Sequence, residues 1–169
     1  MLAKLTVEFL KTWIWWVLAP AVLFPYSSLG APSIEIKGAW VREVPPVSSV
    51  AAGYMVIANT GDEDDRLVGV SSSVSKFAEL HTSEVDDKGV AKMKKLDTIA
   101  VPAGASVELK PYGTHIMLIE LTKPVREGDE VLFELVFEKA GTVKARAKVS
   151  IDAPGETGHK HIHERPHNH

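Results

Sequence analysis

The sequence predicts an all-β fold, an antiparallel β-sandwich or barrel of about nine strands with Greek-key connections. The first indication is that segments rich in β-branched and aromatic residues recur roughly every ten residues between turn residues. The second is that no segment keeps the 3.6-residue period of an amphipathic helix. With 169 residues, the chain has room for one domain of ordinary size and terminal extensions.

The expected strands follow one another along the central part of the chain, and turn residues separate them. Pro45 and Pro46 close the first strand, and Asn59-Thr60-Gly61 closes the second. The last two strands alternate apolar and polar residues, which is typical of a sheet with one face in the core and the other in water. We expect strands at residues 34–41, 51–58, 66–70, 77–81, 90–99, 105–110, 115–121, 131–137 and 142–151.

Residues 1–30 are predicted to be a secretory signal peptide, which leaves residues 31–151 as the folded domain. Two lysines flank the start, an apolar run covers residues 13–24, and small residues follow at 28–31. Two prolines keep the run below the roughly 20 apolar residues that span a bilayer. We expect cleavage near Gly30 or Ala31, a periplasmic location and no stable membrane association afterwards. Retention as a membrane anchor is the alternative, because Glu8 and three tryptophans are unusual in a signal peptide.

The absence of cysteine and the mild negative charge restrict the possible functions. Exported proteins commonly use disulfides, but this chain has no cysteine, so its core alone must hold the fold and any metal site must lack thiolates. The net charge of −3 becomes about −4 when residues 1–30, with two lysines and one glutamate, are removed. A mildly acidic surface argues against nucleic acid as a partner, since nucleic acid selects basic patches.

Two histidines and two methionines in the middle of the chain form the most informative pattern. His115 and Met117 are two residues apart on an expected strand, so their side chains point to one face. His81 and Met93 flank a glycine-containing turn, and a hairpin centred on Asp87 would place them opposite each other. One contact between sheets would then bring the two pairs together. Imidazole and thioether ligands suit copper(I), so four convergent side chains would form a copper(I) site.

Each of these residues also has a simpler explanation when it is considered alone. Met117 lies in an apolar run where a core methionine is the usual case. His115 could be a buried histidine bonded to a carbonyl, and His81 could simply end a strand. Met93 differs, because lysines surround it at positions 92, 94 and 95 and packing does not explain it. The joint pattern therefore carries more weight than any single residue.

The spacing of these four residues resembles the signature of the PCu(A)C family of periplasmic copper(I) chaperones, and the resemblance covers residues 34–150. It implies a cupredoxin-like β-sandwich with exposed copper near one end. It also implies delivery of copper(I) towards the binuclear copper centre of cytochrome c oxidase, so the expected partner is an oxidase subunit or another copper chaperone. Family members often carry a methionine directly after the first histidine, where this chain has Thr82. Further similar segments are Ala39-Trp40-Val41-Arg42, Ala51-Ala52-Gly53-Tyr54, Val101-Pro102-Ala103-Gly104 and Phe137-Glu138-Lys139-Ala140-Gly141.

Residues 152–169 are expected to form a flexible tail, because almost nothing in them can be buried. Alternating imidazoles can reach one ion without a preformed cavity, and imidazole suits copper(II) and zinc. The tail is therefore a second candidate metal site, and a solvated tail with incidental histidines is the alternative. Its histidines are His159, His161, His163, His167 and His169.

These observations favour a monomeric metal carrier over an enzyme. A blue-copper electron-transfer site needs a cysteine ligand, which the chain lacks. No nucleophile-elbow, zinc-protease or phosphate-loop motif occurs in the sequence. A copper-dependent redox enzyme and an exported structural or assembly sandwich without metal are the alternatives.

Overall fold

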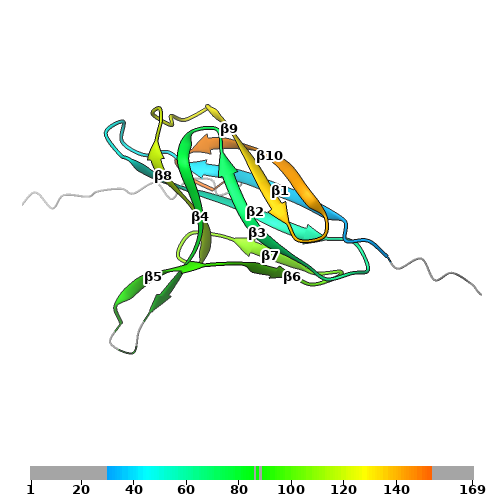
Figure 1. Ribbon diagram of the computed structural model, residues 1–169. Coiled ribbons are helices and arrows are strands. Elements are labelled where there is room, and N and C mark those ends of the chain that lie inside the picture. Colours follow the sequence, from blue (N-terminus) through cyan, green and yellow to red (C-terminus); the bar gives the residue numbers. More distant parts are fainter. Residues whose placement is uncertain (1–29, 86, 88, 154–169) are drawn as a thin grey trace, which may run out of the picture.

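The computed structural model describes residues 30–153 except residues 86 and 88, and this part of the chain folds into ten β-strands (Figure 1). The all-β prediction is confirmed. The expected strand at residues 90–99 is divided in two, because the chain leaves the extended conformation at Asp97 and Thr98. The strands are β1 (Ile34–Arg42), β2 (Val50–Asn59), β3 (Asp65–Ser72), β4 (Ser75–Val85), β5 (Ala91–Leu96), β6 (Ile99–Val101), β7 (Ser106–Leu109), β8 (Thr114–Leu121), β9 (Glu130–Phe137) and β10 (Gly141–Ser150).

Hydrogen bonding joins the strands in the order β5-β4-β8-β2-β1-β10-β9-β3-β6, with β7 beside β2. The pairings are antiparallel except that β1 runs parallel to β10, with Trp40 beside Lys148. This one parallel pair departs from the purely antiparallel expectation, and it joins the two halves of the sheet. No helix in residues 30–153 has the length and the hydropathy needed to cross a membrane.

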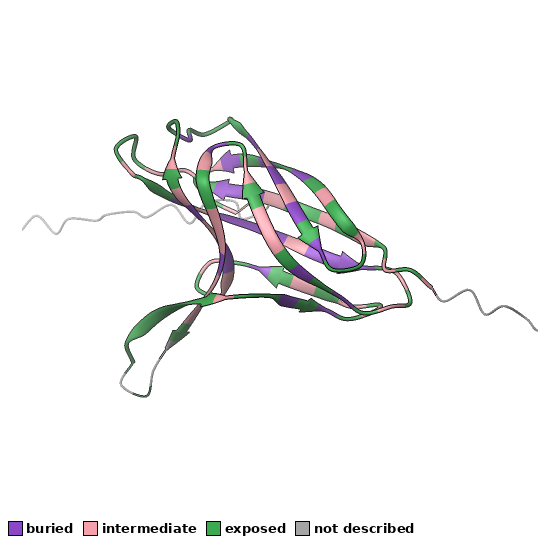
Figure 2. Cartoon of the chain, viewed as in Figure 1, coloured by how far each residue is buried: buried purple, intermediate pink, exposed green. Residues whose placement is uncertain are grey.

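The core lies where the two halves of the sheet face each other, as in a sandwich. The ring of Phe133 on β9 rests on the backbone of Gly53 on β2, and a Cβ atom at Gly53 would lie 2.6 Å from the Phe133 Cζ. Glycine is therefore required there by close approach. Buried positions alternate with intermediate or exposed ones along β9 and in the second half of β10 (Figure 2), as the sequence indicates. The largest fully buried side chains include Phe133, Met55, Ile57, Leu67, Leu109, Ile116, Leu118 and Leu135.

Two buried polar side chains hold the turns that follow β2 and β9. The Asn59 amide donates to the carbonyl oxygens of Glu63 and Val101, 2.7 Å and 3.1 Å away. The Asp65 carboxylate accepts hydrogen bonds from three backbone N–H groups, those of Arg66, Lys139 and Ala140. Burial would raise the pKa of Asp65, but these hydrogen bonds outweigh it, so the pKa of Asp65 lies below its ordinary value.

The hairpin formed by β4 and β5 extends away from the rest of the sandwich (Figure 1). Every residue of β5 except Leu96 is exposed, in contrast to the buried strands of the body. This hairpin carries Met93, so it forms one side of the predicted metal site.

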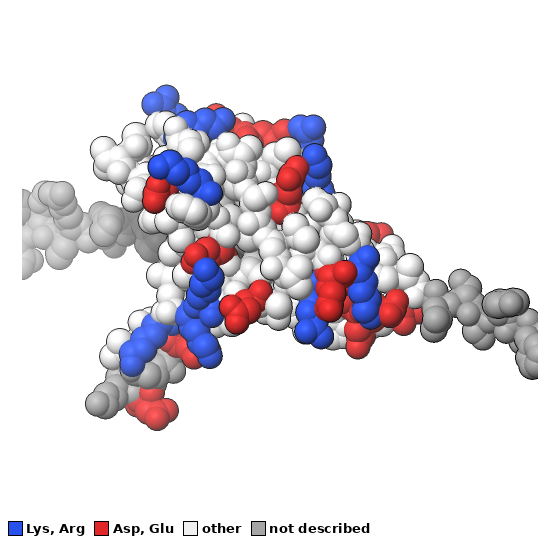
Figure 3. Space-filling view, in the orientation of Figure 1, with Lys and Arg blue, Asp and Glu red and all other residues white. Residues whose placement is uncertain are grey.

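Acidic and basic side chains lie beside one another on the face shown in Figure 3. The described residues also form exposed ion pairs, such as Arg66 with Glu138 and Lys76 with Glu120. Such mixed charge is unlike the continuous basic stripe that a phosphate backbone selects.

Candidate metal centre

The strand register brings the four predicted ligands to one face of three neighbouring strands. In β4 and β8, His81 pairs directly with His115, and Glu79 pairs with Met117. In β4 and β5, Ser83 pairs with Met93. Directly paired residues project to the same face of a sheet, and so do residues two apart on one strand. We call these ligands the four donor residues: His81, Met93, His115 and Met117.

The four donor residues lie on the outer face of the sandwich, because the residues between them point inward. Leu80, Ile116 and Leu118 are buried in the core. The expectation that a contact between two sheets is needed was therefore wrong, since β5, β4 and β8 are adjacent strands. The reason is topological: β8 pairs along the edge of β4 that β5 leaves free.

The position of Met93 in the hairpin also differs from the expectation. Residue 88, and not Asp87, is the midpoint of the paired residues, so Lys95 lies opposite His81 and Met93 lies opposite Ser83. Met93 is thus the diagonal neighbour of His81, which still keeps both side chains on one face and within reach of each other. The prediction that His81 and Met93 are directly opposite was wrong by two residues.

His115 is held by the turn that precedes β8. Its Nδ1 lies 2.9 Å from the carbonyl oxygen of Gly113. Because a carbonyl oxygen only accepts, Nδ1 carries the hydrogen, and Nε2 of the neutral ring keeps its lone pair. The same carbonyl accepts a hydrogen bond from the backbone N–H of Ser83 on β4. His115 is 7% exposed, so its ring is fixed in orientation.

His81 has the opposite arrangement of its two ring nitrogens. Its Nε2 lies 2.9 Å from Oε2 of Glu79, and Oε1 of Glu79 lies 2.6 Å from Nζ of Lys95. Hydrogen bonds from Lys95 and then from His81 lower the pKa of Glu79, so it is a carboxylate. The Nδ1 atom of His81 is buried and has no hydrogen-bond partner in the described part of the chain. A buried nitrogen without a partner costs about 1–3 kcal/mol, and binding a metal ion would offset that cost.

A small hollow of about 230 Å³ opens beside these side chains. Three of the four donor residues line it, namely Met93, His115 and Met117. His81 is not among the lining residues, and the centroid of its ring lies 6.1 Å from that of His115. Met93 is 61% exposed, so the hollow is open to solvent on the hairpin side.

Aromatic side chains border the other side of the hollow. The Tyr54 ring lies 6.4 Å from the His115 ring and 4.6 Å from Trp40, measured between centroids. Burial raises the pKa of the Tyr54 hydroxyl, so the phenol stays neutral near the donors. Tyr112, which is 92% exposed, stands at the rim with a positive φ of 61°. A positive φ is rare for a bulky residue, and here the turn from Lys110 to Gly113 imposes it.

The sequence analysis missed several of these neighbours, Glu79 and Tyr54 among them. Glu79 could have been found, because it lies two residues before His81 and so shares its face. Tyr54 could not, because its place depends on the pairing of β2 with β8.

The donor set defines the chemistry that this face can perform. No three His, Cys, Asp or Glu side chains group together as metal ligands within residues 30–153, residues 86 and 88 aside. A metal ion bound here would therefore depend on the two thioethers together with the two imidazoles. Such a mixed set of neutral ligands favours a soft, monovalent ion over magnesium or calcium.

Two of the predicted segments fall outside the described residues. The structure describes nothing of residues 1–29, where the signal peptide is predicted. It describes nothing of residues 154–169 either, where the tail histidines lie. Both remain predictions.

Comparison with known proteins relates the chain to two named relatives. It is 28% identical over 112 residues to "Putative lipoprotein Lxx21020" of Leifsonia xyli subsp. xyli, which covers 66% of each chain. It is 31% identical over 124 residues to the uncharacterized protein RP573 of Rickettsia prowazekii, which covers 73% of this chain and 64% of the relative. The chain thus spans about two thirds of the length of these curated relatives.

Solved structures share both sequence and fold with the chain. The copper-bound PCuAC domain from PmoF2 is 31% identical with a TM-score of 0.60, over 73% of this chain and 96% of that domain. The solution structure of CuI-DR1885 from Deinococcus radiodurans is 30% identical with a TM-score of 0.58, over 74% of this chain and 83% of that one. Residues 34–149 match the family described as "Putative lipoprotein LpqE-like". The chain therefore belongs to the LpqE-like family, and its domain has the all-β architecture of PCuAC domains.

Proposed function

We propose that this protein is a copper(I) carrier that holds one ion with the four donor residues. The observation that carries the proposal is the register of β5, β4 and β8, which puts two imidazoles and two thioethers on one outer face. The buried Nδ1 of His81 supports it, since a metal ion would partner a nitrogen that no described residue hydrogen-bonds. The likeness to a copper-bound PCuAC domain supports it independently.

Carriage fits this site better than catalysis. All four ligands are neutral, so the site holds the ion without a compensating charge and binds it with moderate strength. Met93 is exposed on the outlying hairpin, whereas His115 is buried in the body. An incoming ligand from another protein can therefore replace Met93 first, while the ligands on β8 still hold the ion.

We further propose that the carrier works in the periplasm and passes copper(I) towards the binuclear copper centre of cytochrome c oxidase. Thioethers suit that compartment, because thiolates would oxidise there. The predicted signal peptide and the lipoprotein description of the family agree with export. The receiving protein would be an oxidase subunit or another copper chaperone, and the carrier would act as a monomer.

We propose for the tail a separate role in capturing copper(II) or zinc through its five histidines. Copper(II) uptake at neutral pH should fall when residues 152–169 are deleted, while copper(I) binding should remain. Equal uptake by the full-length and truncated proteins would show that the tail has no such role.

The main proposal is tested by copper(I) titration against a competing chelator, followed by X-ray absorption of the loaded protein. We expect one copper(I) per chain and a first shell that contains sulfur as well as nitrogen. Replacing a core methionine instead, Met55→Leu, is the matched control and should leave the sulfur signal unchanged. A shell with only nitrogen and oxygen neighbours would refute the assignment.

A further inference from the structure

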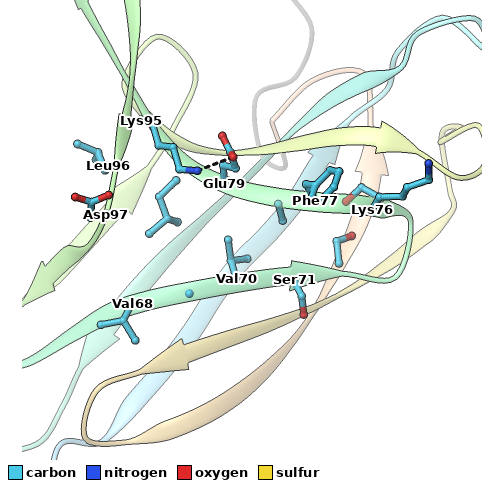
Figure 4. A pocket seen from close by; sticks show the side chains of 14 residues that line it. Val68, Val70, Ser71, Lys76, Phe77, Glu79, Lys95, Leu96 and Asp97 are labelled. Carbon is cyan, nitrogen blue, oxygen red and sulfur yellow. Dashed lines mark hydrogen bonds and ion pairs between the residues drawn. The ribbon is translucent and has the colours of Figure 1, made fainter.

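A carboxylate and a lysine stand behind His81 on the outer face of β4 and β5. Glu79 precedes His81 by two residues on β4, and Lys95 lies directly opposite His81 on β5. Figure 4 shows the Lys95–Glu79 ion pair at one wall of the groove between β3 and β4, which has a volume of about 440 Å³. The three side chains form a continuous chain from Lys95 through Glu79 to His81, with contacts of 2.6 Å and 2.9 Å.

The donors and acceptors in these two hydrogen bonds follow from the chemistry of the three side chains. An ammonium group only donates hydrogen bonds, and a carboxylate only accepts them. Glu79 therefore accepts from Lys95 at one oxygen and from His81 at the other. The hydrogen of a neutral His81 ring must then sit on Nε2, which leaves the lone pair on the buried Nδ1.

We propose that Glu79, held in place by Lys95, is a positioning residue that makes Nδ1 of His81 the nitrogen presented to copper(I). The inference rests on the proposed copper(I) carriage and deepens it. A hydrogen bond from the second nitrogen of a metal-binding imidazole to a carboxylate or a carbonyl fixes its tautomer and orientation. His115 follows the same rule with the opposite nitrogens, because the carbonyl of Gly113 holds the hydrogen on Nδ1.

The ion pair of Lys95 with Glu79 also connects β5, which carries Met93, to β4, which carries His81. Lys95 lies two residues after Met93 on β5, so the two side chains share the outer face. The ion pair with Glu79 therefore links the strand that carries Met93 to the strand that carries His81. The same carboxylate thus contacts both the ring of His81 and the strand that carries Met93.

The decisive variant exchanges the two charges, E79K/K95E. It keeps an ion pair between the same two positions of the hairpin but reverses the polarity at His81, because the lysine introduced at position 79 donates to Nε2. Nitrogen NMR of the copper-free protein at mildly alkaline pH reports which ring nitrogen carries the hydrogen. We expect it on Nε2 of His81 in the original protein and on Nδ1 in the variant. Copper(I) affinity should fall roughly 10- to 100-fold, the usual effect of losing an outer-shell partner.

Two further variants separate positioning from general effects. E134K/K144E exchanges another cross-strand ion pair, between β9 and β10, and should change neither the His81 tautomer nor the affinity. Glu79→Gln offers one oxygen and one NH2 group in place of two acceptor oxygens. Because the ammonium of Lys95 only donates, it takes the oxygen, and the NH2 group then faces Nε2 of His81. The hydrogen of His81 should therefore move to Nδ1 and copper(I) affinity should fall, so this variant serves if the exchanged variant fails to fold.

An unchanged His81 tautomer in E79K/K95E would overturn the positioning role, and so would a reversed tautomer with unchanged affinity. With Glu79→Gln, a hydrogen that stays on Nε2 together with an unchanged affinity would overturn it too. The tautomer is measured without copper, so it tests the role of Glu79 independently of whether the protein binds copper(I). Failure of the original protein to bind copper(I) would instead refute the proposed function.

Discussion

The two faces of β4 and β8 differ in what they do for the protein. On the inner face, Leu80, Ile116 and Leu118 are buried in the core. On the outer face, alternating with them, stand three of the four donor residues, and the fourth projects from β5 to the same side. Successive side chains of a strand point to opposite faces, so the same strands stabilise the fold with one face and bind the metal with the other. Substitutions on one face should leave the property of the other face nearly intact.

The largest effect should come from the inner face. Replacing Ile116 by alanine removes a fully buried side chain between His115 and Met117. We expect the free energy of unfolding to fall by about 2–5 kcal/mol, as for other large-to-small core substitutions. The copper(I) affinity of the molecules that remain folded should change less than threefold. Chemical denaturation and chelator competition measure the two quantities, and a parallel loss of both would contradict the separation.

Next in size are the outer-face substitutions Met117→Leu and Met93→Leu. Each keeps the volume and removes the sulfur, so copper(I) affinity should fall by about tenfold or more because thioethers suit the soft ion. The free energy of unfolding should change by less than about 1.5 kcal/mol for Met117 and not measurably for the exposed Met93. His115→Ala should reduce affinity at least as much as either. A stability loss at Met93 would show that the hairpin packs more closely than its exposure indicates.

Acidification separates the faces without mutation and should have the smallest effect on the free energy of unfolding. Acid should release copper(I), because protons compete with the ion for the imidazole nitrogens. The fold should persist to lower pH. The pKa of Asp65 is lowered in the folded state, so its stabilising effect is complete above the ordinary value of 3.8 and is lost as the pH falls through the lower folded value.

Between these limits the protein should be folded and free of copper. Circular dichroism and copper retention, followed across the same pH range, test this expectation. Asp65→Asn should make the fold less dependent on pH in the acid range, and the release of copper should not move. Coincident loss of copper and fold at one pH would contradict the separation.

Much of this architecture could be predicted from the sequence because it depends on local pattern. The strand positions follow from alternation between turn residues, and the shared face of His115 and Met117 follows from their spacing of two. Register across a hairpin depends on the turn geometry, which the sequence did not reveal, so the predicted partner of Met93 was wrong by two residues. The break at Asp97 and Thr98 carries no strong turn signal.

Contacts between distant strands were the least accessible to prediction. The parallel pairing of β1 with β10 and the approach of Tyr54 to His115 depend on how the halves of the sheet meet. The ion pair of Glu79 with Lys95 needs the true register before it can be seen. In each case the residue types were evident, but the pairing that gives them a role was not.

The parallel pair has a consequence for the order in which the chain can become a folded protein. The first strand borders the last, and Ala145, Ala147 and Val149 of β10 complete the core. A chain that is still being synthesised therefore lacks the central seam of its sheet until about residue 150 has emerged. Contacts so far apart in sequence also form slowly. Until β10 is available the domain stays unfinished, a state in which assistance from general folding factors is most valuable.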